Sequence, residues 1–310
     1  MKVEIKNAAS GSTLFTFSDV TNRSTVLDIK KRIAETDRKL YISRQSLRTS
    51  PKGKSLNNDR ILEELMETDR AETLCLYLRD LGPQIGWRTV FLVEYTGPLV
   101  AYFLTWLLRQ QFLHCSWFTP ITTHLLLRNI AMVCWCGHYI KRLLETLFVH
   151  RFSHATMPLR NLFKNGTYYY GFGAFVGYFV NHPLYTFPAY GYFQVFVGLG
   201  LFLLGEIGNL QCHLTLRNLR PAGSTVRLIP HPVAGQPLTD LFSLVACPNY
   251  TYEIIAWAGF AIMTQSFPAA LFTFVGGVQM SLWALNKLRA YRREFPEYPK
   301  NRRAIIPFIL

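Results

Sequence analysis

The sequence predicts an all-α, polytopic membrane bundle of about six transmembrane helices, preceded by a small α+β domain. Hydrophobic residues make up 50% of the 310-residue chain, and from Trp87 onward they gather in long runs. These runs approach the roughly 20 residues that an α-helix needs to cross a bilayer. Before Trp87, apolar residues recur at the spacing of strands and helices, as they do in a soluble domain.

The chain is strongly basic, with 33 Lys and Arg against 19 Asp and Glu and a formal net charge of +14. The positive charges cluster beside the apolar runs, which is typical of the cytosolic flanks of membrane spans. No basic–aromatic module accompanies them, so nucleic acid is not an expected partner. The six cysteines lack metal-ligand spacing, and no third ligand accompanies His150 and His154, so no metal site is expected.

Residues 1–80 form a predicted cytosolic domain, because the N-terminus lacks the apolar core of a signal peptide. Its expected elements are a strand at 3–5, a strand at 14–17, a helix capped by Thr25, a strand at 45–48 and a strand at 73–78. The order of these elements resembles the ubiquitin-like β-grasp fold. No Gly-Gly terminus follows, so a conjugated modifier is not expected.

Residues 81–86 are expected to be a linker, and residues 87–310 a transmembrane domain with a basic C-terminal tail. The predicted spans are 87–108, 121–140, 167–186, 194–214, 239–259 and 261–284. The loops between them alternate between weakly charged and strongly basic. With the first domain cytosolic, an even number of spans and the positive-inside rule both predict a cytosolic C-terminus.

Polar residues inside the apolar runs carry the functional signal. Glu94 stands alone within the first span, where a carboxylate needs a partner or a proton. The structural alternative is a hydrogen bond to a neighbouring helix.

Near the end of the second span, Tyr139 and Arg142 share a helix face, and Lys141 pairs with Glu145 at i,i+4. These residues favour a polar site reached from the basic side of the membrane. The basic residues that follow them fit a belt at the membrane surface: Arg151, Arg160 and Lys164.

A second polar stripe runs along the fourth span towards the same side. It comprises Glu206, Asn209, His213, Arg217 and Arg220, with Arg227 in the loop beyond. In the fifth segment, Asn249, Glu253 and Trp257 follow one another at one-turn steps. Amides and carboxylates of this kind can hold the carboxamide and ribose of a nicotinamide dinucleotide, and arginines can hold its phosphates. No GxGxxG motif follows a strand, so a Rossmann fold is not expected. The pattern alone fits a transporter or a channel equally well.

Four motifs add a resemblance to a known family. They are HYIKRLLETLFVHRFS at 138–153, LRNLRPAG at 216–223, CPNYTYEIIAW at 247–257 and EYPKNRRAIIPFIL at 297–310. These motifs resemble the steroid 5α-reductase superfamily, and with the ubiquitin-like N-terminus they resemble its very-long-chain trans-2-enoyl-CoA reductase branch. The resemblance covers essentially the whole chain.

The resemblance implies an enzyme of the endoplasmic-reticulum membrane with both termini in the cytosol. It implies that NADPH serves the last reduction of the fatty-acid elongation cycle, acting on very-long-chain trans-2-enoyl-CoA, with a further role in sphingosine 1-phosphate metabolism. The lipid bilayer and the other membrane enzymes of the cycle (elongase, ketoreductase and dehydratase) are the implied partners.

The same resemblance implies roles for individual residues. Glu94 and Tyr139 match the carboxyl and phenol that bind the substrate carbonyl in steroid-reducing members, and Tyr250 lies in a shared motif. The expected cofactor-binding residues are Lys141, Arg142, Glu145, Asn209, His213, Arg217, Arg220, Arg227, Asn249, Glu253, Trp257 and Tyr291. Two positions depart from the steroid reductases. His213 replaces an acidic residue, and Lys287 replaces a histidine.

These residues suit the reduction of an enoyl thioester. Hydride addition to the β-carbon leaves an enolate, whose developing charge a phenol can stabilise. The hypothesis is Tyr139 as donor to the thioester oxygen, Glu94 as its partner and NADPH as the hydride source. Tyr250 and solvent are the candidates that protonate the α-carbon. An interfacial aromatic belt is the structural alternative for Tyr139 and Tyr250.

Two other functions compete with this reading. One is a reductase of steroid or polyprenol-type enones, against which the ubiquitin-like domain and the KRLLETLFVHRF version of the motif argue. The other is a non-catalytic scaffold that binds elongation-cycle enzymes through residues 1–80. The presence of Tyr139, Arg220 and Glu253 argues against the scaffold.

Overall fold

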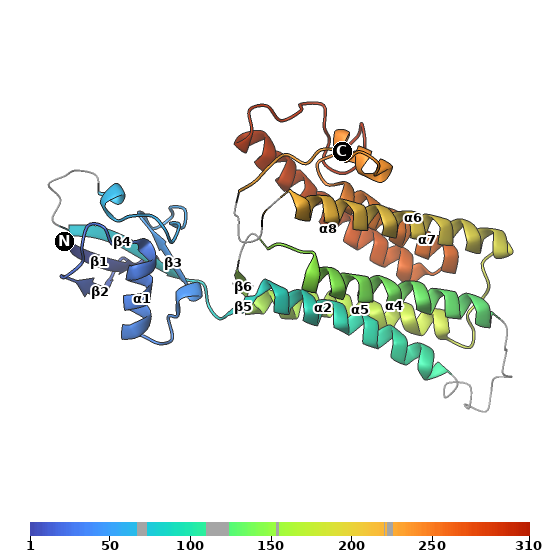
Figure 1. Cartoon of the computed structure of the whole chain (residues 1–310). Coiled ribbons are helices and arrows are strands. Elements are labelled where there is room, and N and C mark those ends of the chain that lie inside the picture. The colour runs from blue at the N-terminus through green and yellow to red at the C-terminus, as the bar shows by residue number, and fades with distance from the viewer. Residues whose placement is uncertain (67–72, 110–123, 153–154, 220, 222–225) are drawn as a thin grey trace. The chain divides into compact units, whose positions relative to one another are not determined.

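The computed structural model describes the chain except for residues 67–72, 110–123, 153–154, 220 and 222–225 (Figure 1). The chain divides into two compact units. One comprises Met1–Trp87 with His154–Phe163, and the other comprises Arg88–Ser153 with Lys164–Leu310.

The N-terminal unit contains a four-stranded sheet with one helix. Its elements are β1 (Lys2–Asn7), β2 (Thr13–Phe17), α1 (Val26–Thr36), the 3₁₀ turns η1 (Ile42–Arg44) and η2 (Glu63–Leu65), β3 (Gln45–Arg48) and β4 (Thr73–Asp80). The strand order is β2-β1-β4-β3, with β1 parallel to β4 and antiparallel to β2. The predicted ubiquitin-like arrangement is confirmed.

Local chemistry explains where the helix and the first turn lie. The Thr25 hydroxyl accepts a hydrogen bond from the Asp28 backbone N–H, and the Asp28 carboxylate accepts one from Thr25 N, which completes a capping box. Gly11 has a φ of +73°, which the turn between β1 and β2 requires and which a side chain would oppose. The helix then buries Val26, Ile29 and Ile33 against the sheet.

The segment expected to be a linker, residues 81–86, contains a short strand. Gln84–Gly86 is a strand, β5, which pairs antiparallel with β6 (Thr156–Pro158). The two strands lie about seventy residues apart in the sequence, so no local sequence pattern predicts their pairing.

Six long helices follow within the described residues, in the order of the predicted spans (Figure 1). They are α2 (Trp87–Leu107), α4 (Leu125–Phe148), α5 (Leu159–Asn181), α6 (Gly191–Asn218), α7 (Pro248–Thr264) and α8 (Phe267–Glu294). The fifth predicted span is wrong at its start, because a 3₁₀ turn, η3 (Pro237–Ser243), precedes Pro248 at the first turn of α7. The helices α4 and α8 extend well beyond the predicted spans, into charged sequence.

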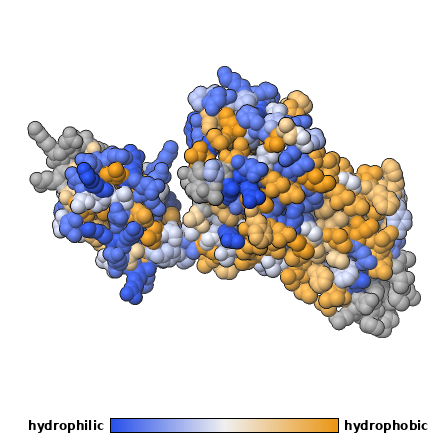
Figure 2. Space-filling model, in the orientation of Figure 1, coloured by the Kyte–Doolittle hydropathy of each residue, from blue (hydrophilic) through white to orange (hydrophobic). Residues whose placement is uncertain are grey.

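Three helices of the described chain are long and apolar enough to cross a membrane: α2, α6 and α8. They identify a membrane protein, whereas the predicted count of six spans is not confirmed. α7 has 17 residues, and α4 carries the charged residues Lys141, Arg142 and Glu145. Figure 2 shows hydrophobic residues over much of the visible surface of the helices. Phe196, Phe274 and Trp283 are among the exposed apolar side chains, as expected for surfaces that face lipid.

Glycines set how closely the helices approach. In α6, a Cβ on Gly205 would lie 2.5 Å from the backbone nitrogen of Ala256 in α7, and one on Gly198 would lie 2.4 Å from that of Met263. In α5, Gly173 lies against the backbone of Pro98 in α2. Small residues at these crossings bring the backbones together, which is the usual way that membrane helices associate.

The C-terminal tail folds back onto the start of α7. The backbone N–H of Ala246 donates to the carbonyl of Arg303, and the Thr251 hydroxyl donates to the carbonyl of Ile305. Tyr291 at the end of α8 stacks on Tyr298 of the tail, with ring centroids 5.2 Å apart. The tail is therefore part of the helical unit.

We predict that Gly205→Ala destabilises the protein by about 1–3 kcal/mol, because the new methyl group meets the backbone of α7. Thermal unfolding in detergent measures the effect. Gly200→Ala is the matched control on the same helix, because a Cβ there meets no atom within 4 Å. A Gly205→Ala variant as stable as this control would contradict the packing account.

Candidate functional site

Polar and ionised side chains gather where α4, α6 and α7 face one another. His138 of α4 is buried, and its two ring nitrogens face two carboxylates. Nδ1 lies 2.7 Å from Oε1 of Glu206 in α6, and Nε2 lies 3.3 Å from Oε1 of Glu253 in α7. Carboxylates accept hydrogen bonds, so each ring nitrogen of His138 has an acceptor on a different helix. One imidazole thereby joins three helices.

Lys141, one turn along α4, completes this group. Its Nζ lies 2.8 Å from Oε2 of Glu206 and donates to Oδ1 of Asn209 at 2.9 Å. The Asn209 amide nitrogen in turn donates to the backbone carbonyl of Asn249 and to Oε2 of Glu253, at 3.0 and 2.9 Å. With both ends of its side chain engaged, Asn209 has one orientation.

Trp257 supports the same carboxylate from one turn along α7. Its indole Nε1–H donates to Oε1 of Glu253 at 3.2 Å, while its ring packs edge-on against His138 and Trp135. The structure thus brings together five residues expected from the sequence: Lys141, Asn209, Asn249, Glu253 and Trp257. Sequence reasoning did not include His138 and Glu206 among the site residues. Glu206 was visible as a member of the polar stripe, whereas His138 had only its place beside Tyr139.

Arg142 forms a second ionic group on the same helix. Its Nη1 donates to Oε2 of Glu145 at 2.6 Å and lies 3.3 Å from Nδ1 of His213. Its Nη2 donates to the hydroxyl of Tyr95 in α2 at 2.8 Å. His213 Nδ1 also lies 3.1 Å from Oε1 of Glu145. A guanidinium held at three points has little rotational freedom.

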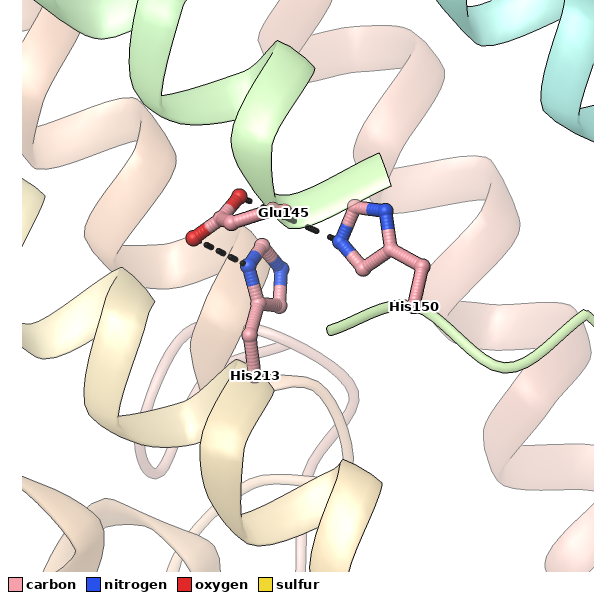
Figure 3. Close-up of side chains that lie close together, drawn as sticks. All are labelled: Glu145, His150 and His213. Atoms are coloured by element: carbon pink, nitrogen blue, oxygen red, sulfur yellow. Dashed lines mark ion pairs between the residues drawn. The ribbon is translucent and has the colours of Figure 1, made fainter. Parts of the chain in front are cut away.

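Glu145 and His213 also lie close to His150, which follows α4 (Figure 3). Nε2 of His150 is 3.9 Å from Oε2 of Glu145. Burial, with the nearby charge of Arg142, lowers the pKa of His150 to about 3, so this imidazole is neutral at neutral pH. Two histidines and a carboxylate could ligate a metal ion, but Arg142 already contacts Glu145 and His213 as a cation. We therefore interpret the group as an arginine-centred network. His154 lies outside the described residues.

Glu94 and Tyr139 are both buried, but each has its own surroundings. Oε1 of Glu94 accepts a hydrogen bond from the Asn165 amide of α5 at 2.8 Å. The ring of Tyr139 lies among those of Tyr95, Trp135 and Trp257, at centroid distances of 6.2, 5.5 and 6.0 Å. The described contacts of Glu94 thus agree with the structural alternative of a bond to a neighbouring helix. A direct Glu94–Tyr139 pair is not among them.

The other expected residues lie at the edge of this site or elsewhere. Tyr250 packs beside Trp283, and Tyr291 belongs to the apolar cluster with Tyr298. Arg227 is half-exposed and pairs with Glu294 at 2.9 Å, and Arg217 is partly exposed in the last turn of α6. Arg220 lies outside the described residues.

Two family comparisons account for most of the chain. Residues 155–310 match the family described as 3-oxo-5-alpha-steroid 4-dehydrogenase, and residues 1–80 match the ubiquitin-like domain of TECR. Together with the apolar helices, the first match defines a membrane protein of the steroid 5α-reductase superfamily.

Curated relatives narrow the assignment. The chain is 51% identical to the probable very-long-chain enoyl-CoA reductase of Caenorhabditis elegans, over 96% of this chain and 95% of that protein. It is 49% identical to the very-long-chain enoyl-CoA reductase of Dictyostelium discoideum, over 76% of this chain and 74% of that one. It is 38% identical to the human trans-2,3-enoyl-CoA reductase-like protein, over 100% of this chain and 84% of that protein. The chain belongs to the very-long-chain enoyl-CoA reductase family.

We predict that Lys141→Met destabilises the protein by about 1–3 kcal/mol, because it leaves the partly buried Glu206 without its lysine partner. Glu206→Gln has a similar effect with the opposite charge imbalance. The double variant restores neutrality, so its loss is smaller than the sum of the single losses by about 1 kcal/mol or more. Thermal unfolding of the four proteins in detergent measures this coupling, and strictly additive losses would contradict it.

Proposed function

We propose that this protein is an NADPH-dependent very-long-chain trans-2-enoyl-CoA reductase, which reduces the 2,3 double bond of the thioester. The observation that carries the proposal is the buried network of Asn209 and Glu253 next to the ring of Tyr139, in a chain similar along nearly its whole length to named enoyl-CoA reductases. Burial removes competing water, so hydrogen bonds and charges at this site act more strongly than they would in solvent.

The donor set suits a nicotinamide dinucleotide. Both amide hydrogens of Asn209 are already donated, to Asn249 and Glu253, so what the pair offers a ligand is oriented acceptor oxygens. Oδ1 of Asn209 and the carboxylate of Glu253 can accept hydrogen bonds from a carboxamide N–H or from ribose hydroxyls. Lys141, Arg142, Arg217 and Arg227 offer positive charge for phosphates, and we propose Arg220 for the same role. When bound, NADPH would supply a hydride. Arg142 would act as a positive charge held in place by Glu145, whereas a phosphate at Arg227 would compete with Glu294.

The chain's own residues would bind the thioester and keep water away from it. The Tyr139 hydroxyl donates a hydrogen bond to the thioester oxygen and stabilises the enolate charge, an effect worth a few kcal/mol for an oriented donor. Glu94, which accepts a hydrogen bond from Asn165, would act as the partner of that donor. The apolar rings around Tyr139 exclude water from the reacting carbons.

We further propose the cellular setting. The enzyme would lie in the endoplasmic-reticulum membrane with both termini in the cytosol, and would complete the fatty-acid elongation cycle beside the elongase, ketoreductase and dehydratase. A role in sphingosine 1-phosphate metabolism would follow from the same chemistry on a different enoyl-CoA. The basic C-terminal tail supports the cytosolic side, because positive segments flank spans there.

A second candidate is a reductase of steroid or polyprenol-type enones. The match of residues 155–310 to the steroid dehydrogenase family favours it, because hydride addition to an enone is the same chemistry. A non-catalytic scaffold would use residues 1–80, which match a ubiquitin-like domain. The relatives named as enoyl-CoA reductases favour the thioester over both.

Cofactor oxidation by the purified, detergent-solubilised protein separates these functions. The protein is given a long-chain trans-2-enoyl-CoA or a steroid enone, with NADPH or NADH. We expect rapid oxidation of NADPH with the thioester. Oxidation with the enone alone would assign the second candidate, and a folded protein that reduces neither substrate would favour the scaffold.

We predict that Tyr139→Phe lowers kcat for the enoyl-CoA by about 10²-fold or more, because the oriented donor to the thioester oxygen is lost. The buried ring is retained, so the melting temperature should change little. Tyr190→Phe is the control, since Tyr190 is 78% exposed. Near-normal turnover by a folded Tyr139→Phe variant would rule out this role.

A further inference from the structure

Reduction of an enoyl thioester needs a proton at the α-carbon as well as a hydride at the β-carbon. The group that supplies the proton must carry an O–H or N–H and must remain stable after losing it. In a buried site this second condition requires a nearby cation or hydrogen-bond donors, because an isolated phenolate there is very costly.

Tyr95 of α2 meets both conditions. Its hydroxyl accepts a hydrogen bond from Nη2 of Arg142 at 2.8 Å, so its own O–H remains free to donate elsewhere. The Arg142 guanidinium carbon also lies 5.0 Å from the centroid of the Tyr95 ring. The charge left on a deprotonated Tyr95 would thus be stabilised directly by a guanidinium, which stays protonated.

Two other residues fix the position of Arg142. Glu145 and His213 contact its Nη1, whereas its Nη2 donates to Tyr95. Glu145 is nearly fully buried, and so is His213. This carboxylate and imidazole orient the guanidinium towards the phenol. Figure 3 shows part of this network, and Arg142 is the residue that connects it to Tyr95 of α2.

Among the described contacts, neither Tyr139 nor Tyr250, the two phenols expected from the sequence, receives a hydrogen bond from a guanidinium. Tyr139 lies among aromatic rings, and in the described part of the chain the hydrogen bond from Arg142 to a phenol goes to Tyr95. Tyr250 packs against Trp283. Tyr95 is nevertheless next to Tyr139, with ring centroids 6.2 Å apart. One phenol can therefore bind the thioester oxygen while the neighbouring phenol faces the adjacent carbon.

We propose that Tyr95 is the catalytic residue that protonates the α-carbon, with Arg142 stabilising its phenolate. The assignment rests on the proposed enoyl-CoA reduction. Hydride from a reduced nicotinamide forms a C–H bond at the β-carbon, and the π electrons of the double bond move to give the enolate. The enolate then takes the proton of the Tyr95 hydroxyl at the α-carbon, and the phenolate regains a proton from water. Tyr95 thereby replaces Tyr250 and solvent as the expected donor.

The test follows the α-proton itself. Wild-type protein and Tyr95→Phe reduce a long-chain trans-2-enoyl-CoA with NADPH in D₂O, and the configuration of the α-deuterium in the product is determined. Wild type should place deuterium on one face. Tyr95→Phe should lower kcat by about 10²-fold or more, as for loss of a general acid. Its residual product should carry deuterium on both faces, because water protonates the released enolate.

Three further variants separate chemistry from folding. Tyr190→Phe serves as the exposed control, and should match wild type in rate and in stereochemistry. Replacement of Tyr95 by 3-fluorotyrosine keeps the hydroxyl and the fold but makes the phenol more acidic. It should move the basic limb of the kcat profile to lower pH, whereas 3-fluorotyrosine at 190 should not.

The outcomes distinguish the two proposals. Wild-type protein that does not reduce the thioester overturns the proposed function, and this assignment with it. An active wild type whose Tyr95→Phe variant keeps its rate and single-face deuteration overturns the assignment alone. An unchanged pH profile with 3-fluorotyrosine at 95 does the same, even where the phenylalanine variant does not fold.

Discussion

Burying charge inside an apolar bundle is the constraint on which the centre of this protein depends. An ion removed from water costs several kcal/mol unless opposite charges and hydrogen bonds surround it. The structure meets this condition twice on one face of α4. Lys141 is matched by Glu206, with His138 between Glu206 and Glu253, and Arg142 is matched by Glu145. Because Glu206 comes from α6 and Glu253 from α7, the first group also fixes how these helices face α4.

The same pairing orients the groups that would perform the chemistry. Asn209 and Glu253 are held by several partners each, so neither has to reorganise when a ligand binds. Arg142 is directed at Tyr95 by Glu145 and His213. Preorganised donors of this kind account for much of the catalytic power of enzymes, because their orientation does not have to be created during the reaction. Close helix crossings at Gly198 and Gly205 keep the supporting helices near enough for these contacts.

The sequence allowed the N-terminal fold to be predicted almost element by element, because its signals are local. Thr25 with Asp28, and Gly11 in the first turn, specify a cap and a turn by their own chemistry. In the helical unit, apolar runs predicted where the helices lie, but their ends were less certain. α8 extends to Glu294 through basic sequence that hydrophobicity alone assigns to a tail. The pairing of β5 with β6 joins distant segments, and nothing local specifies it.

The residue types of the site could be predicted from the sequence, but the contacts between residues on different helices could be predicted only in part. One-turn spacing predicted Asn249, Glu253 and Trp257 on one face of α7, where Trp257 donates to Glu253 and Asn249 takes part through its backbone carbonyl. Spacing along one helix cannot reveal which residue of another helix lies opposite. The bond from Asn165 to Glu94 and the bond from Arg142 to Tyr95 therefore came only from the structure. Tyr95 in particular is an aromatic residue in an apolar span, where packing is the ordinary explanation.

The central claim is that this bundle reduces the 2,3 double bond of an enoyl thioester by direct hydride transfer. It is tested most directly by incubating the purified protein with trans-2-enoyl-CoA and NADPH that carries deuterium at the transferable position. Mass spectrometry of the product should find a saturated acyl-CoA with one deuterium, located at the β-carbon. Unchanged enoyl-CoA, or a saturated product whose β-carbon carries no deuterium, would contradict the claim.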